Sequence, residues 1–86
     1  MSYEVRQTRS SFDSYSNYEY EIFREGQLVA RYWHDYRGDE HGIAFANGSR
    51  EACPSGRMID FLDGGGLRPT TLSRRAIAYL DERLAV

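Results

Sequence analysis

Side chains that could do chemistry are densest between residues 32 and 41, which read Tyr-Trp-His-Asp-Tyr-Arg-Gly-Asp-Glu-His. Trp, Tyr and Arg anchor protein interfaces more often than other residues do, and the aromatic ones bury a large area. This composition predicts a surface that binds a protein partner. The residues that we expect to contact the partner are Trp33, His34, Asp35, Tyr36, Arg37 and Asp39.

The same stretch contains residue types that can bind metals. Zinc requires three or four ligands in a tetrahedral arrangement, and the sequence has neither a Cys-x-x-Cys pair nor a His-Glu-x-x-His motif. Its acidic residues also lack the alternating spacing of a calcium loop. We therefore expect a solvated loop without a metal, although it holds His34, His41, Asp35, Asp39 and Glu40.

A second candidate site lies where the glycine-rich residues 63–69 run into a helical pattern. Glycine amides and a helix N-terminus both attract anions, although the spacing here is neither that of a P-loop nor that of a dinucleotide fingerprint. Two arginines in the first turn oppose the helix dipole, so either an internal carboxylate, which we favour, or an external anion should compensate them. The candidate anion-binding residues are Gly65, Gly66, Thr70, Thr71, Arg74 and Arg75.

Nucleophilic catalysis has little support in the sequence. Cys53 is the only cysteine, and Arg50 and Arg57 flank it in the sequence. No histidine lies near it in the sequence to act as the base that converts its thiol to a thiolate. The carboxylates are scattered and show no pair suited to acid–base work. We therefore expect a protein that is not an enzyme and that uses no cofactor.

Length and charge narrow the classes further. The 86 residues suit a single α+β domain over residues 1–86, and the formal charge of −2 argues against nucleic acid as a partner. No apolar stretch is long enough to cross a membrane, and the N-terminal residues lack the apolar run of a secretory signal. Together with the single cysteine, these features predict a cytoplasmic protein.

The elements that must position these residues begin with strands predicted at 3–9, 18–23, 28–33 and 43–46. The second and third should form a hairpin. A three-residue loop at 24–26 predicts that Ile22 lies opposite Leu28 and that Glu19 lies opposite Arg31 as an ion pair. The alternative is a two-residue turn formed by Glu25 and Gly26.

Loops are expected at 10–17 and 35–42. The segment 54–62 favours a short helix, with a buried strand as the alternative. A clear amphipathic pattern predicts a helix from about residue 72 to 84, capped by Thr70 or Thr71. The fold class is therefore α+β: an antiparallel β-meander of three to four strands packed against a C-terminal α-helix, with a second short helix as an option.

The faces of this meander decide what Trp33 can do. If the C-terminal helix covers the face that carries the tyrosines, Trp33 and Phe23 lie on the open face of the sheet. The alternative is that the second helix or the loop at 10–17 covers them. An open aromatic patch on a small protein would indicate a binding surface.

The main hypothesis is a small cytoplasmic protein-binding module that acts by surface contact. Its partner is another protein or a second copy of the chain. In size and charge alone, the chain resembles phage-encoded inhibitors of bacterial defence systems, which makes such an inhibitor one alternative. The other alternative is a binder of a small anionic ligand at the glycine-rich loop.

Overall fold

The computed structural model describes residues 3–9, 18–35, 40–54, 56–57, 60–63 and 68–84. The elements in chain order are β1 (Tyr3–Arg9), β2 (Tyr18–Arg24), β3 (Gln27–His34), β4 (His41–Phe45), β5 (Arg50–Ala52), β6 (Leu62–Asp63), β7 (Arg68–Leu72) and α1 (Arg74–Leu84). The first five strands form one sheet in sequence order, and β6 pairs with β7 in a small second sheet. Every neighbouring pair is antiparallel.

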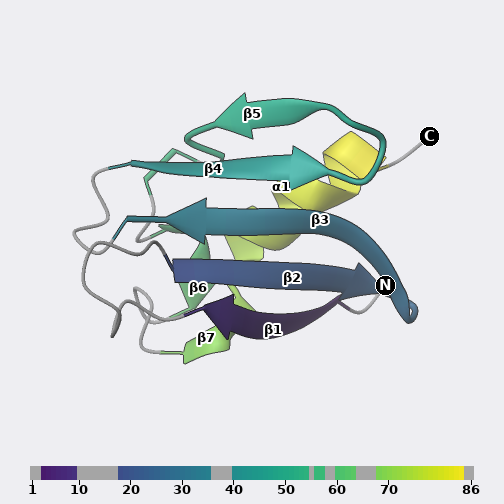
Figure 1. The fold of residues 1–86 in the computed structure, drawn as a ribbon, viewed down its shortest axis with the longest axis horizontal. Coiled ribbons are helices and arrows are strands. Elements are labelled where there is room, and N and C mark those ends of the chain that lie inside the picture. The colour runs from purple at the N-terminus through teal and green to yellow at the C-terminus, as the bar shows by residue number, and fades with distance from the viewer. Residues whose placement is uncertain are drawn as a thin grey trace.

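This arrangement is the predicted α+β fold. Figure 1 shows the five-stranded sheet in front and α1 crossing behind β3 and β4. Alternation along β2 explains the two faces, because Tyr20 and Ile22 are buried toward the helix while Glu19 and Glu21 lie on the other side. The core between sheet, helix and small sheet contains Val5, Tyr20, Ile22, Ala30, Tyr32, Ile43, Phe45, Phe61, Leu62, Leu72, Ala76 and Leu80.

The predicted register of the β2–β3 hairpin is wrong by two residues. Ile22 lies opposite Ala30 rather than Leu28, because the chain reverses in a two-residue turn and a bulge follows between Ile22 and Phe23. Glu25 and Gly26 have φ angles of 52° and 81°, the conformation that two-residue hairpin turns favour. A shift of two residues keeps every side chain on its predicted face.

The new register also changes the predicted ion pair. Glu19 lies opposite Trp33, and Glu21 lies opposite Arg31. The Arg31 guanidinium is 3.6 Å from the Glu21 carboxylate, with two-thirds of the arginine side chain exposed. The pair therefore exists, but with a different glutamate.

Three other predicted boundaries differ from the structure. Residues 41 and 42 belong to β4 rather than to a loop, and β5 was not expected at all. The described part of 54–62 contains no α-helix, and Leu62 at its end starts a strand. Residues 68–72, expected partly as a break and partly as helix, form β7.

The C-terminal helix begins two residues later than predicted, and its cap is a different residue. The Ser73 hydroxyl accepts a hydrogen bond from the Ala76 backbone N–H at 3.0 Å and donates one to the carbonyl of Asp60. Ser73 is thus the N-cap. The expected caps, Thr70 and Thr71, lie in β7 because Leu72 pairs with Leu62.

Candidate functional site

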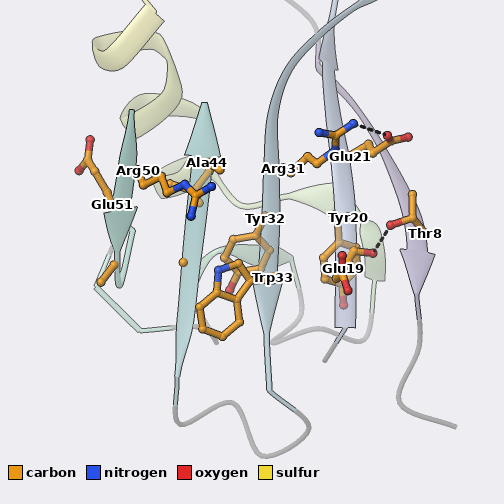
Figure 2. A pocket seen from close by; sticks show the side chains of 13 residues that line it. Thr8, Glu19, Tyr20, Glu21, Arg31, Tyr32, Trp33, Ala44, Arg50 and Glu51 are labelled. Atoms are coloured by element: carbon orange, nitrogen blue, oxygen red, sulfur yellow. Dashed lines mark hydrogen bonds and ion pairs between the residues drawn. The ribbon is translucent and has the colours of Figure 1, made fainter. Parts of the chain in front are cut away.

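The face of the sheet away from α1 carries the candidate site. A shallow groove of about 550 Å³ crosses this face. We call it the Trp33 groove, and the residues that matter for its chemistry are Arg31, Trp33, Gly42, Ala44, Arg50 and Ala52. Figure 2 shows Arg31, Trp33, Ala44 and Arg50 on neighbouring strands, with the indole lying between β3 and β4.

Trp33 is held flat on the sheet by its cross-strand neighbour, Gly42. A Cβ atom built on Gly42 would lie 2.8 Å from the indole Nε1, which is closer than such contacts occur. Only glycine at this position therefore lets the indole pack directly over the β4 backbone, as in other pairs of a strand glycine with an aromatic neighbour. The ring remains partly exposed.

Small side chains extend the floor of the groove beyond the indole. In the sheet register, Ala52 lies next to Gly42, and Ala44 lies two residues further along β4 on the same face. Because none of these residues reaches far above the backbone, the indole face is not covered by its strand neighbours. The result is an apolar shelf beside an aromatic wall.

Charged side chains surround this shelf. Arg31 leans toward β2, where it meets Glu21 (Figure 2). Arg50 extends from β5 toward β4 and is exposed. Within the part of the chain that the structure describes, Arg50 makes no ion pair or hydrogen bond. Among the described residues, the groove thus has an unpaired arginine, Arg50, on one side and glutamates on the other.

Phe23, the other aromatic residue expected on the open face, lies there as well. It is partly buried, and the Arg6 guanidinium sits 4.5 Å from the centre of its ring. This cation–π contact covers Phe23 from solvent. Trp33 has no such covering contact among the described residues.

The predicted partner-binding residues do not all share this face. His34 is only 5% exposed and lies in the core. Asp35 follows β3, where its backbone N–H donates to the carbonyl of Glu40 at 3.0 Å and so closes the loop to β4. The other three predicted residues, Tyr36, Arg37 and Asp39, lie outside the described residues.

The two histidines lie opposite each other on β3 and β4, and both are buried. The Nδ1 atom of His34 is 2.7 Å from the Asp35 carbonyl, which can only accept, so Nδ1 carries the hydrogen. Nε2 is then free to accept from the Tyr20 hydroxyl at 2.8 Å. His34 is therefore a neutral ring with both nitrogens hydrogen-bonded.

His41 forms a matching arrangement. Its Nε2 donates to the Gly56 carbonyl at 3.0 Å, and its Nδ1 accepts from the Tyr32 hydroxyl at 3.1 Å. Burial raises the pKa of Tyr20 to about 12 and raises that of Tyr32 as well, while burial lowers the pKa of His34. Both tyrosines thus remain protonated donors, and the histidines serve the core.

The predicted anion site is only partly within the described residues. Gly65 and Gly66 lie outside them, and Thr71 is an exposed residue of β7. Arg75 lies 3.3 Å from the Asp60 carboxylate, which also contacts Arg57 at 3.4 Å. The internal carboxylate that would compensate Arg75 is therefore present.

The remaining candidates from the sequence are isolated. Cys53 is exposed with a φ angle of 50°, and its backbone N–H donates to the His41 carbonyl at 2.9 Å. Among the described residues, no three His, Cys, Asp or Glu side chains gather where they could hold a metal ion. Arg74 is exposed on the first turn of α1.

Sequence reasoning missed Gly42, Ala44, Arg50 and Ala52. Gly42 was assigned to a loop, and β5 was not predicted, so no strand was available to place Arg50 or Ala52 beside Trp33. A signal exists in hindsight, because alternation in 41–45 and a turn at Asn47-Gly48 predict a second hairpin.

Comparison with known proteins adds no relative. No protein-family model matches the chain, and neither a curated protein nor a solved structure is similar to it. In the described part of the chain, no helix is both long and apolar enough to cross a membrane.

Proposed function

We propose that this protein is a small cytoplasmic protein-binding module that acts through the Trp33 groove, by surface contact rather than catalysis. One observation carries the proposal: a partly exposed indole held on Gly42 at the centre of a sheet face that the helix leaves open. Exposed aromatic patches with a polar rim mark interaction sites, and Trp is the residue most enriched among interface anchors.

The hydrogen bonds of the described residues support contact rather than chemistry. A histidine that acts as a general base needs a free nitrogen within reach of a substrate. His34 and His41 each use both ring nitrogens within the core. The Cys53 thiol makes no hydrogen bond to a histidine ring among the described residues, so no such ring activates it there.

The direct test compares protein capture by the wild-type chain with capture by Trp33→Ala. We expect the mutant to lose its partner, because truncating a central aromatic anchor commonly weakens binding by about 2 kcal/mol or more, roughly 30-fold. Arg74→Ala, an exposed change on α1, is the matched control and should capture as the wild type does. Affinity capture with quantitative mass spectrometry measures all three.

A second variant protects this test against a change in folding. Gly42→Val keeps the indole but places side-chain atoms where the ring now lies, so it should displace Trp33 and weaken capture. Circular dichroism verifies that each variant is folded. If folded Trp33→Ala and Gly42→Val both capture the same partners as the wild type, the proposal is wrong.

A further inference from the structure

We infer that the Trp33 groove binds an extended protein segment that presents a large apolar side chain and, two residues away, a carboxylate that pairs with Arg50. This inference rests on the proposed function and specifies the chemistry of the partner. The main observation is that Trp33 approaches β4 from β3, while Arg50 approaches it from β5 on the opposite side (Figure 2).

The strand register places the open-face residues in two rows across the sheet. One row contains Glu21, Arg31, Ala44 and Arg50, and the other contains Glu19, Trp33, Gly42 and Ala52. The rows are two residues apart along each strand, which is about 7 Å. The first row has a charged residue at each end, Glu21 and Arg50. In the second row, the residues that follow Glu19 carry no charge.

The two groups meet over β4. The Trp33 indole lies against Gly42, and Arg50 reaches from β5 toward the same strand beside Ala44. In an extended segment, side chains two residues apart point to the same side and are also about 7 Å apart. A segment lying along β4 would therefore place one of its side chains on the indole. The side chain two residues further along the segment, which points the same way, would then lie at Arg50.

The charges specify what that second side chain is. Arg31 is already paired with Glu21. Arg50 is exposed and has no ion-pair partner among the described residues, so its guanidinium is available for a carboxylate, which it can bind with two parallel hydrogen bonds. Partial shielding by the partner would strengthen this pair above that of an exposed ion pair.

The opposite wall of the groove argues against a longer anionic chain. Glu19 and Glu21 lie on β2, beyond the indole from Arg50. A polyphosphate backbone crossing the groove would meet these carboxylates, whereas a single carboxylate over β4 does not. The partner is therefore a protein segment with a local acidic group.

A second copy of the chain is the competing occupant of this face, and the position of the two-fold axis decides which charges meet. Arg6 lies in the same row as Arg31 and Arg50, because it pairs with Glu21. If two copies met face to face around a two-fold axis along β3, Arg31 would face Arg31 of the other copy, and Arg50 would face Arg6 of the other copy. An axis across the strands would instead bring Glu19 and Glu21 of the two copies together. Like charges meet in both cases. An axis between β3 and β4 would instead place Glu21 against Arg50 of the other copy, so self-association is the outcome that sedimentation must separate from peptide binding.

The test is a selection of random peptides displayed on phage, with the full chain as bait. We expect enriched peptides to contain an aromatic or large aliphatic residue with Asp or Glu two positions away. A synthetic peptide of the enriched sequence should lose roughly tenfold in affinity when its carboxylate is changed to the amide, and a similar factor on Arg50→Gln in the protein. With Arg50→Glu as bait, enrichment should move to Lys or Arg at the same position.

Arg74→Glu is the matched control, because it makes the same charge change at an exposed arginine of α1. Peptides that require Trp33 but lack the spaced carboxylate, or that bind Arg50→Glu equally well, would overturn this inference while supporting the proposed function. Failure to enrich any peptide that depends on Trp33 would contradict both. Circular dichroism of each bait excludes misfolding as the cause.

Discussion

The neutral ring of His34 is buried in the core, so protonation of this residue should destabilise the fold. The ring of His34 stacks on Tyr18 with centroids 4.6 Å apart and accepts its hydrogen bond from Tyr20. A proton on Nε2 would remove that acceptor, and the Tyr20 hydroxyl would have to turn its hydrogen away and accept instead. The neighbouring Asp35 favours the charged ring, but burial opposes the charge more strongly, and the ring that lies opposite on β4, His41, is buried as well.

We therefore expect stability to fall in mild acid. Burial lowers the pKa of His34 below its usual value of 6.5, so the unfolded chain binds this proton more tightly than the folded one. The free energy of unfolding should be insensitive to His34 above that value and should decline as the pH falls below it, by about 1.4 kcal/mol for each unit of pKa difference. Urea denaturation at a series of pH values measures the slope.

The matched variant for this measurement is His34→Gln, which removes the titrating ring but keeps a hydrogen-bonding side chain. Its stability at neutral pH should be lower, and its decline in acid should be shallower than that of the wild type. Equal slopes for the two proteins would show that His34 does not cause the acid sensitivity.

At the scale of single residues, sequence composition identified Trp33 but not the residues that form the groove around it. Its aromatic character is local information. That Gly42 lies beneath the ring and Arg50 lies beside it depends on pairing across β3, β4 and β5, which residue types alone do not specify. His34 was misplaced for the opposite reason: a polar residue in a charged stretch can be buried when partners satisfy both nitrogens.

Among the elements, the start of α1 depends on one serine. Ser73 caps the helix and also bonds the carbonyl of Asp60, so it connects the helix to the turn before β6. Sequence reasoning chose a threonine because Leu72 continues the apolar helical spacing. The structure uses Leu72 in β7 instead, where it still reaches the core. A short strand and a helix start can share one apolar pattern, which explains the error.

We expect Ser73→Ala to reduce the free energy of unfolding by about 1 kcal/mol, within the range of about 0.5–2 kcal/mol for the loss of an N-cap. Thr71→Ala is the matched control, since Thr71 is an exposed strand residue that should contribute little. Urea denaturation with comparable m values measures both. If the two variants lose equal stability, Ser73 is not the cap that matters.

The far end of α1 is fixed to the sheet by a second polar contact. Arg83 in the last turn forms two hydrogen bonds with Glu51 on β5 and lies over the ring of Tyr79. The hydrogen bonds from Arg83 hold the pKa of Glu51 below its usual value, whereas burial, together with the neighbouring Glu51, raises the pKa of Tyr79 to about 12. It also fixes the position of β5, the strand that carries Arg50. The helix on one face therefore helps to position a groove residue on the other.

For the whole molecule, the fold class followed from the order of patterns, because a meander and a terminal amphipathic helix allow few arrangements. The number of strands did not follow. β5 and β6 have three and two residues, too short to show a period. Yet β5 forms one side of the candidate groove. The parts of the fold with least sequence signal were those closest to the candidate site.

The pattern of charge on the open face predicts the state of the free protein. Like charges oppose each other in two of the face-to-face pairings described above, and the proposed partner is a different protein, so we expect a monomer in solution. Sedimentation velocity at increasing concentration should give one species with the mass of 9.9 kDa. A dimer that dissociates on Arg50→Glu or Trp33→Ala would contradict this and would make the groove a self-association surface.

Trp33 is the only tryptophan in the chain, although seven tyrosines accompany it. Its indole therefore provides all of the fluorescence that can be excited selectively at the red edge of aromatic absorption. Since that single fluorophore forms a wall of the groove, a ligand that reaches it changes the polarity around the emitter and its exposure to collisional quenchers. The native chain thus carries an optical probe at the candidate site and needs no label.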